Sequence, residues 1–116
     1  MFDHVGLRVK DARASTRFYT AVLEPLGLVP DASGTGFGPP GAPALWLYDG
    51  AKGDRGVHLA FRAKDRASVD RFHAAGLAAG GKDNGKPGVR ADYDPKYYAA
   101  FLVDPDGNNV EAVCTK

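Results

Sequence analysis

Two histidines occupy the same position in a phrase that the chain uses twice. Residues 4–11 and 58–65 carry His, Arg, Lys and Asp in the same order, 54 residues apart, with His4 and His58 first. Glu111 lies near the end of the chain in a strand-like stretch. Imidazole and carboxylate groups are ligands for Fe, Mn, Ni, Co or Zn, and two His with one carboxylate leave coordination positions open for substrate. The residue types therefore predict a reactive site for a divalent metal ion.

Alternating hydrophobic residues predict that these three side chains share one face. Residues 2–9 and 57–63 alternate as strands do, so their hydrophobic residues fall on one side and the histidines on the other. Gly6 and Ala60, two positions after each histidine, leave space above that face. In the last strand, hydrophobic neighbours take the packed side, so Glu111 points the same way as the histidines. We expect the three side chains to face a common cavity.

Each strand that carries a histidine is followed by a predicted helix. Asp11 is placed to cap a helix that begins at Ala12, and Pro25 and Gly27 end it. A second helix is expected at 66–79. Further strands are expected at 28–32, 35–38, 44–48, 89–93, 97–103 and 109–114, separated by Gly-, Pro- and Asn-containing turns such as Asn84-Gly85 and Pro87-Gly88.

The predicted order is β-α-β-β-β, repeated once. Each half alone would leave a half-buried sheet, so packing two halves together is a physical reason for the repeat. We predict one α+β domain over residues 1–116, with a first module at 1–56, a second at 57–116 and a linker at 51–56. The two modules are expected to form a curved, half-open mixed β-sheet cup with the helices outside.

The composition is that of an ordinary globular chain. Of the 116 residues, 44% are hydrophobic and 25% are charged, and the net charge is +1. This balance predicts no nucleic-acid partner and no membrane association. The single Cys114 cannot form an internal disulfide, which favours a reducing compartment, so we expect a cytoplasmic protein.

Several motifs resemble one family over nearly the whole chain. They are Asp3-His-Val-Gly-Leu7, Arg17-Phe-Tyr19, Leu26-Gly-Leu28, His58-Leu-Ala-Phe61, Tyr97-Tyr-Ala-Ala-Phe101 and Asp104-Pro-Asp-Gly-Asn-Asn-Val-Glu111. Together they resemble the vicinal oxygen chelate superfamily, which includes glyoxalase I, extradiol dioxygenases, fosfomycin-resistance thiol transferases and bleomycin-sequestering proteins. The resemblance is greatest to small bacterial glyoxalase-like proteins and implies paired β-α-β-β-β modules.

The resemblance implies the same three metal ligands as the alternation does. It places His4 on the first strand, His58 on the fifth and Glu111 on the eighth. Glyoxalase I adds a carboxylate on the last strand of its first module, where this chain has the segment 44–48 without an acid and Trp46 near the equivalent of Glu111. The usual methylglyoxal chemistry is therefore not expected.

Other residues are candidates for contacts with a substrate. A phenol could supply acid–base assistance or orient a bound oxygen, and the candidates are Tyr97, Tyr98, Tyr93 and Tyr48. Of the adjacent Tyr97 and Tyr98, alternation sends only one inward. Apolar walls are expected from Trp46, Tyr48 and Phe37, although aromatic residues in strands more often serve packing. The segment 84–94 is expected to form a mobile rim over the cavity.

The remaining polar residues have separate expected roles. In the rim, Arg90 and Asp94 are candidate substrate contacts. His73 is expected at an amphipathic helix surface or an interface. The turn that begins at Asp104 is expected to be conformational, with its Asp and Asn side chains bonding neighbouring amides.

Two functions remain open from the sequence. One is a metal-dependent enzyme, a lyase or dioxygenase of this superfamily, that acts on a small substrate with adjacent oxygens. The other is a metal-free protein that sequesters a small molecule, as bleomycin-resistance proteins do. Members of this size often form homodimers, and in some the metal site combines the first module of one chain with the second module of its partner. We therefore expect a homodimer.

Overall fold

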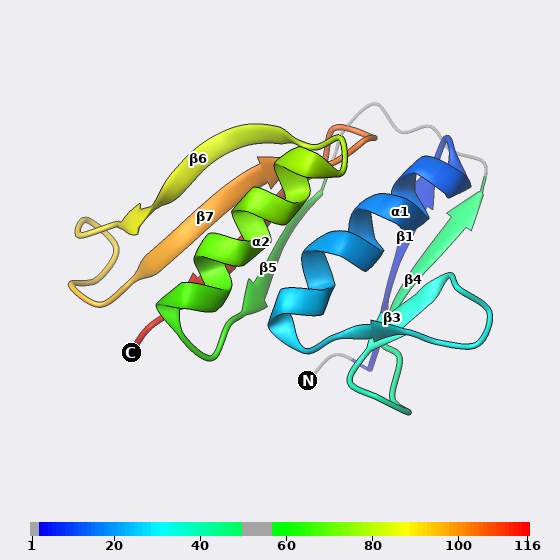
Figure 1. Ribbon diagram of the computed structural model, residues 1–116, viewed down its shortest axis with the longest axis horizontal. Coiled ribbons are helices and arrows are strands. Elements are labelled where there is room, and N and C mark those ends of the chain that lie inside the picture. The colour runs from blue at the N-terminus through cyan, green and yellow to red at the C-terminus, as the bar shows by residue number, and fades with distance from the viewer. Residues whose placement is uncertain (1–2, 50–56) are drawn as a thin grey trace.

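The computed structural model describes residues 3–49 and 57–116 and contains two β-α-β-β-β units in sequence (Figure 1). The first unit consists of β1 (Val5–Val9), α1 (Ala12–Leu23), a short 3-10 helix η1 (Glu24–Leu26), β2 (Val29–Pro30), β3 (Gly36–Gly38) and β4 (Leu45–Asp49). The second consists of β5 (His58–Arg62), α2 (Arg66–Ala78), β6 (Lys82–Val89), β7 (Tyr98–Val103) and β8 (Asn109–Cys114). The predicted α+β class is confirmed. The predicted linker at 51–56 lies outside the described residues.

Each unit forms its own open, mixed four-stranded sheet. The strand orders are β1-β4-β3-β2 and β5-β8-β7-β6. In both sheets the first and last strands of the unit pair in parallel, and the other pairs are antiparallel. The two helices pack against each other and cover one side of the sheets (Figure 1). The other side of each sheet is left for the predicted site residues.

Local chemistry explains where the two helices begin. The Asp11 carboxylate accepts hydrogen bonds from the amides of Arg13 and Ala14, at 3.0 and 3.1 Å. Asp65 does the same for the amide of Ser68, at 2.8 Å. Both caps satisfy amides that have no partner inside a helix.

The hydrophobic sides of helices and strands form a shared core. Its fully buried side chains include Phe18 and Val22 of α1, Val69 and Phe72 of α2, and Leu102 of β7. Burying side chains of this size stabilises a fold by about 1.5–3 kcal/mol each. The core therefore fixes both sheets beneath the helices.

The turn between β7 and β8 links the two units. Asp104 accepts hydrogen bonds from the amides of its own turn, as expected, and also from the buried hydroxyl of Tyr19 in α1, at 2.6 Å. Burial and the neighbouring Asp104 raise the pKa of Tyr19. Asp106 accepts from the amide of Lys10 at 2.9 Å and from the hydroxyl of Ser15 at 3.1 Å. These bonds tie the turn of the second unit to the first helix and to the residue just before its cap.

The path of β6 corrects two sequence predictions. A strand was expected at 89–93, with turns at Asn84-Gly85 and Pro87-Gly88, but the strand covers Lys82–Val89 and includes both dipeptides. The chain accommodates them because β6 is an edge strand whose pairing with β7 shifts register on both sides of Gly85. Glycine permits the φ of 153° found at that position. Much of the predicted rim at 84–94 is therefore paired strand.

His73 is also placed differently from the prediction. It was expected at a surface or interface, but its side chain is only 8% exposed and lies between α2 and β6. Its Nε2 contacts the Asp83 carboxylate at 2.9 Å. The amide of Gly85 and then His73 hold the pKa of Asp83 below 3.8. The longer β6 explains the difference, because Asp83 belongs to the part that was expected to be loop.

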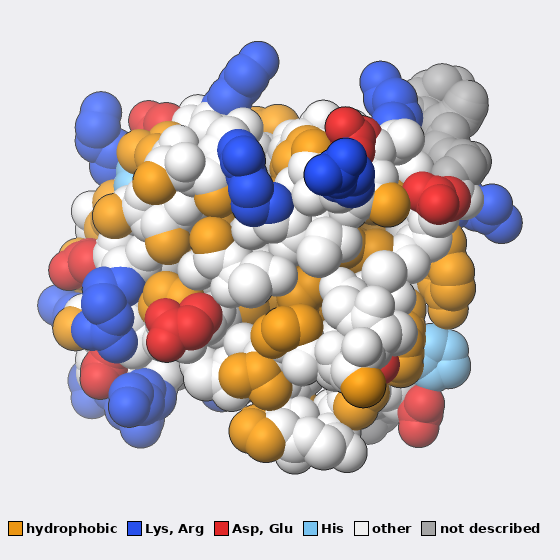
Figure 2. Space-filling view, turned by 45° about the vertical axis from the view of Figure 1, so that its right-hand side comes forward, with side chains coloured by type: hydrophobic (Ala, Val, Ile, Leu, Met, Phe, Trp, Pro, Cys, Tyr) orange, Lys and Arg blue, Asp and Glu red, His pale blue; other side chains and the backbone are white. Residues whose placement is uncertain are grey.

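The surface is charged but mixed. On the face shown in Figure 2, Lys and Arg side chains are interspersed with Asp and Glu side chains. Neither helix of the described part of the chain is long and apolar enough to cross a membrane.

Candidate functional site

His58 and Glu111 lie together on the face of the second sheet that the helices do not cover. The parallel pairing of β5 with β8 sets Ala60 opposite Glu111 and His58 opposite Asn109. The Nε2 atom of His58 lies 3.0 Å from Oε1 of Glu111. The Glu111 residue is 2% exposed, whereas the His58 side chain is 49% exposed. A buried carboxylate and an accessible imidazole therefore meet at this point.

A second contact of His58 fixes which ring nitrogen carries its proton. Nδ1 lies 3.1 Å from the backbone oxygen of Asn109, and a carbonyl oxygen can only accept a hydrogen bond. In the neutral imidazole, Nδ1 is therefore the donor and Nε2 directs its lone pair toward Glu111. Two acceptors 3.0 Å apart repel each other unless a proton or a metal cation lies between them.

This arrangement fits a metal ligand pair. Ligands at about 2.1 Å from one cation, at right angles, are about 3.0 Å apart, which is the separation seen here. Histidine ligands commonly donate their other N–H to a backbone carbonyl or a carboxylate, which orients the ring. The separation of His58 and Glu111 is compatible with such a pair and equally with a hydrogen bond from a protonated His58, and the orienting bond is present in either case.

Tyr97 completes the surroundings of Glu111. Its hydroxyl donates to Oε2 of Glu111, so both carboxylate oxygens have a partner within the chain. This bond, with partial burial, raises the pKa of Tyr97 to about 12. The hydroxyl therefore remains protonated, and hence a donor, across the neutral range.

The structure decides which of the two adjacent tyrosines lies at this site. Tyr97 faces Glu111, whereas the hydroxyl of Tyr98 donates to Asp70 of α2, at 2.6 Å. That bond raises the pKa of Tyr98. Tyr98 belongs to the helix-covered side, away from His58.

His4 lies just before β1 and has an orienting bond of its own. Its Nδ1 is 2.7 Å from the Asp3 carboxylate, and its side chain is 56% exposed. As in His58, Nδ1 faces an oxygen atom and Nε2 is left to bind elsewhere. Within residues 3–49 and 57–116, however, no three His, Cys, Asp or Glu side chains gather closely enough to hold a metal ion. His4 therefore stands apart from the other two predicted ligands of its own chain.

The first sheet presents aromatic residues on its uncovered side. Register places Trp46 opposite Gly6, as Glu111 lies opposite Ala60, so Trp46 occupies the position equivalent to Glu111. A Cβ at Gly36 would come within 2.4 Å of the Trp46 ring, and one at Gly6 within 2.5 Å of the Tyr48 ring. The two glycines therefore let these rings lie close against the sheet. Tyr48 is 51% exposed.

Phe37 does not share this surface. It is 1% exposed and belongs to the hydrophobic core, with its ring centre 6.3 Å from that of Tyr19. The structure therefore places Phe37 on the helix-covered side, whereas Trp46 and Tyr48 remain on the side expected for a substrate.

Arg90 and Asp94, the two rim candidates, have different surroundings. The guanidinium of Arg90 lies over the Phe101 ring, 5.3 Å from its centre, and the same ring stacks with His58 at 6.4 Å. Asp94 is exposed, and its carboxylate accepts a bond from the amide of Lys96 within the turn. Only Arg90 is connected to the site through these contacts.

Sequence reasoning missed the part of Phe101 in this site. Phe101 lies opposite Glu111 in the pairing of β7 with β8 and fills the space between His58 and Arg90. Its alternation with Tyr97 along the strand was a usable signal. Asp3 was also missed as the partner of His4.

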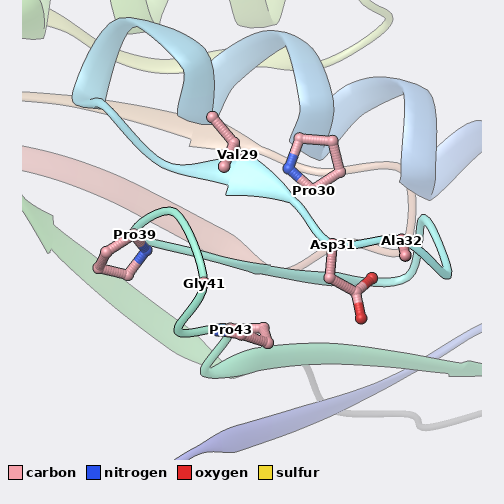
Figure 3. Close-up of a pocket in the computed structure, with 7 residues that line it drawn as sticks. All are labelled: Val29, Pro30, Asp31, Ala32, Pro39, Gly41 and Pro43. Carbon is pink, nitrogen blue, oxygen red and sulfur yellow. The ribbon is translucent and has the colours of Figure 1, made fainter.

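A separate pocket lies at the edge of the first sheet and includes none of the predicted site residues. It has a volume of about 310 Å³ and is lined by residues of β2 and the two neighbouring loops (Figure 3). Three of its seven lining residues are prolines.

Comparison with known proteins agrees with the fold and the motifs. Residues 1–112 match the family model of the Glyoxalase/Bleomycin resistance protein/Dioxygenase superfamily. The crystal structure of a glyoxalase/bleomycin resistance protein from Albidiferax ferrireducens T118 is 34% identical, covers 100% of this chain and 99% of its own, and has a TM-score of 0.81.

Two further solved structures share the fold at lower identity. A glyoxalase/dioxygenase from Nostoc punctiforme is 24% identical, over 100% of this chain and 91% of that chain, with a TM-score of 0.72. A glyoxalase/bleomycin resistance protein/dioxygenase family enzyme from Burkholderia phytofirmans PsJN is 18% identical, over 100% of both chains, with a TM-score of 0.74. No curated protein matches the chain. The match over residues 1–112 and the 34% identity together show that the chain belongs to the glyoxalase/bleomycin resistance protein/dioxygenase superfamily.

Proposed function

We propose that the protein is a metal-dependent enzyme that acts on a small substrate with adjacent oxygen atoms. His4, His58 and Glu111 would hold a divalent cation, one of Fe, Mn, Ni, Co or Zn. The observation that carries this proposal is the approach of His58 Nε2 to within 3.0 Å of a buried carboxylate, with Nδ1 held 3.1 Å from the backbone oxygen of Asn109. A bound cation would satisfy both groups and would polarise substrate oxygens during reaction.

The three ligands would come together in a homodimer. His58 and Glu111 form one half of the site, and His4 is exposed at the start of β1 with its Nε2 oriented outward from Asp3. A two-fold dimer in which the uncovered side of the first sheet faces the uncovered side of the partner's second sheet would complete two equivalent sites. It would also cover the exposed Tyr48 and bring Trp46 to the substrate.

The chain's own side chains have distinct roles in this proposal. Tyr97 holds the Glu111 carboxylate in place through its hydroxyl, and the backbone oxygen of Asn109 orients His58. The position equivalent to Glu111 in the first unit is Trp46, so a fourth carboxylate ligand is not supplied there. The proposed chemistry is thus closer to that of a dioxygenase or a thiol transferase than to that of glyoxalase I.

A metal-free binding protein is the second candidate. The supporting observation is that both oxygens of Glu111 already have partners, because an imidazolium form of His58 would donate to one and Tyr97 donates to the other. In that case the aromatic surface of Trp46 and Tyr48 would sequester a small molecule. Metal content separates this candidate from the enzyme.

The test is elemental analysis of protein purified without chelator or affinity tag. We expect about one metal ion per chain in the wild type and strong loss in His4→Ala, His58→Ala and Glu111→Gln. Asp70→Asn is the matched control, because Asp70 also accepts a bond from a tyrosine but lies on the helix side. Equal metal content in all variants would reject the site. Turnover assays with catechols, α-keto aldehydes and thiol-plus-epoxide pairs then identify the reaction.

A further inference from the structure

Arg90 is held rigidly beside the candidate metal site. Its Nη1 donates to the backbone oxygen of Gly88 at 2.9 Å, and its Nη2 donates to that of Lys86 at 2.8 Å. These two carbonyls belong to the part of β6 where the pairing with β7 is irregular. A guanidinium has five N–H donors, so three remain for other partners.

The contacts of Phe101 connect this guanidinium to His58. The Arg90 guanidinium carbon lies 5.3 Å from the centre of the Phe101 ring, and the His58 ring lies 6.4 Å from the same centre, tilted by only 20°. The cation is therefore no farther from the imidazole than these two distances combined. A ligand that binds at His58 and Glu111 and extends across Phe101 would therefore approach Arg90.

The charge of Arg90 has no acidic partner in the part of the chain that the structure describes. The ion pairs formed there involve His4, His58, His73 and Lys86, but not Arg90. Glu111, on the same face, already accepts a bond from Tyr97 and lies 3.0 Å from Nε2 of His58. A fixed, half-buried guanidinium without a carboxylate partner is suited to bind an anionic group from outside.

We propose that Arg90 determines substrate specificity by binding a carboxylate on the substrate, so that the natural substrate is an anionic compound with adjacent oxygens. This inference rests on the proposed function, because the adjacent oxygens would bind at His58 and Glu111. The chelating end of the substrate lies at the metal site, and its carboxylate lies over Phe101 against the free N–H groups of Arg90.

The test compares two chelators that differ by one carboxylate group. Catechol and protocatechuate both offer adjacent hydroxyls, and protocatechuate adds a carboxylate one ring's length away. Calorimetric titration of each into metal-loaded wild-type protein should show tighter binding of protocatechuate by about 10- to 100-fold, the usual effect of a hydrogen bond to a charged group. Arg90→Gln should abolish this difference and leave catechol binding unchanged.

A matched control separates charge recognition from a structural role. Arg66 also lies over an aromatic ring, that of Tyr98 at 4.9 Å, but on the helix side. Arg66→Gln should keep the full preference for protocatechuate. If the wild type binds both chelators equally, or if Arg90→Gln weakens both to the same extent, Arg90 only secures the irregular strand and the proposal is wrong.

A metal-free arm keeps this inference distinct from the metal assignment. Benzoate cannot chelate, so its binding to apo protein, followed by NMR titration, depends on the carboxylate alone. Binding that is lost in Arg90→Gln and kept in Arg66→Gln supports the anion site even if the protein proves to hold no metal. Benzoate binding to apo protein that is absent, or that is the same in Arg90→Gln, overturns the proposal, as equal affinities for the two chelators do.

Discussion

The Tyr97→Phe substitution tests whether the buried Glu111 depends on the phenol beside it. The change removes one hydroxyl and keeps the ring, whose centre lies 5.0 Å from that of Tyr93. Glu111 is 2% exposed, so water cannot readily replace the lost donor at Oε2. A hydrogen bond to a charged group contributes about 1.5–3 kcal/mol, and we expect the free energy of unfolding to fall by about 2 kcal/mol.

Tyr98→Phe is the matched control for this loss. It deletes the same group from the adjacent tyrosine, which also donates to a carboxylate, but Asp70 is exposed and water can take the place of the hydroxyl. We expect a loss below about 1 kcal/mol. For a chain of 116 residues, about 2 kcal/mol corresponds to a fall of about 8 °C in Tm.

The assay is thermal and urea unfolding at one protein concentration, with chelator present. In a Glu111→Leu background, Tyr97→Phe should cost almost nothing, because the partner of the hydroxyl is already gone. Equal losses for the two Tyr→Phe variants, or an unchanged cost in the Glu111→Leu background, would refute the view that Tyr97 stabilises a buried carboxylate.

Three further predictions concern the frame around the site. The Gly85 amide and then His73 hold the pKa of Asp83 below 3.8. The ionised carboxylate therefore stabilises the fold above pH 3.8, and this stabilisation is lost as the pH falls through the lower pKa of the folded state. Asp83→Asn should therefore flatten the decline of the urea midpoint below pH 3.8. Gly76→Ala should lower the free energy of unfolding by about 1–3 kcal/mol, measured by thermal unfolding, because the added Cβ would lie 2.2 Å from Leu102. A more stable variant would contradict this close packing. Tyr19→Phe should lower the free energy of unfolding by about 2 kcal/mol in urea, since it removes the one donor to the buried Asp104 carboxylate that comes from the first unit. A neutral effect would show that this bond does not join the two units.

The sequence was sufficient to predict the elements that carry a simple period. Alternation in the strands that hold His58 and Glu111 correctly placed both on the uncovered side of the second sheet. The repeat also predicted the two helices, and Asp11 was expected as the cap of the first. These features depend on the chemistry of neighbouring residues, so they can be predicted from a short stretch of sequence.

Features that depend on tertiary contacts could not be predicted from the sequence. Glycine and proline in β6 indicated turns, but pairing with β7 draws the segment into a strand, and this pairing in turn buries His73. The side of the sheet that Tyr97 faces, and the bond of His58 to the Asn109 carbonyl, depend on where neighbouring strands start and on their register. The separation of His4 from His58 depends on how two whole units pack.

Mixed dimers show whether the metal site is shared between two chains. His4→Ala and Glu111→Gln chains, each without metal on its own, are unfolded together, refolded at equal amounts and analysed for bound metal by elemental analysis. A mixed dimer pairs an intact His4 from one chain with an intact His58 and Glu111 from the other, so it has one complete site. Random pairing makes half of the dimers mixed, and each mixed dimer has one complete site of two. We therefore expect the mixture to recover about a quarter of the wild-type metal content. A mixture that holds no more metal than its separate components would contradict it.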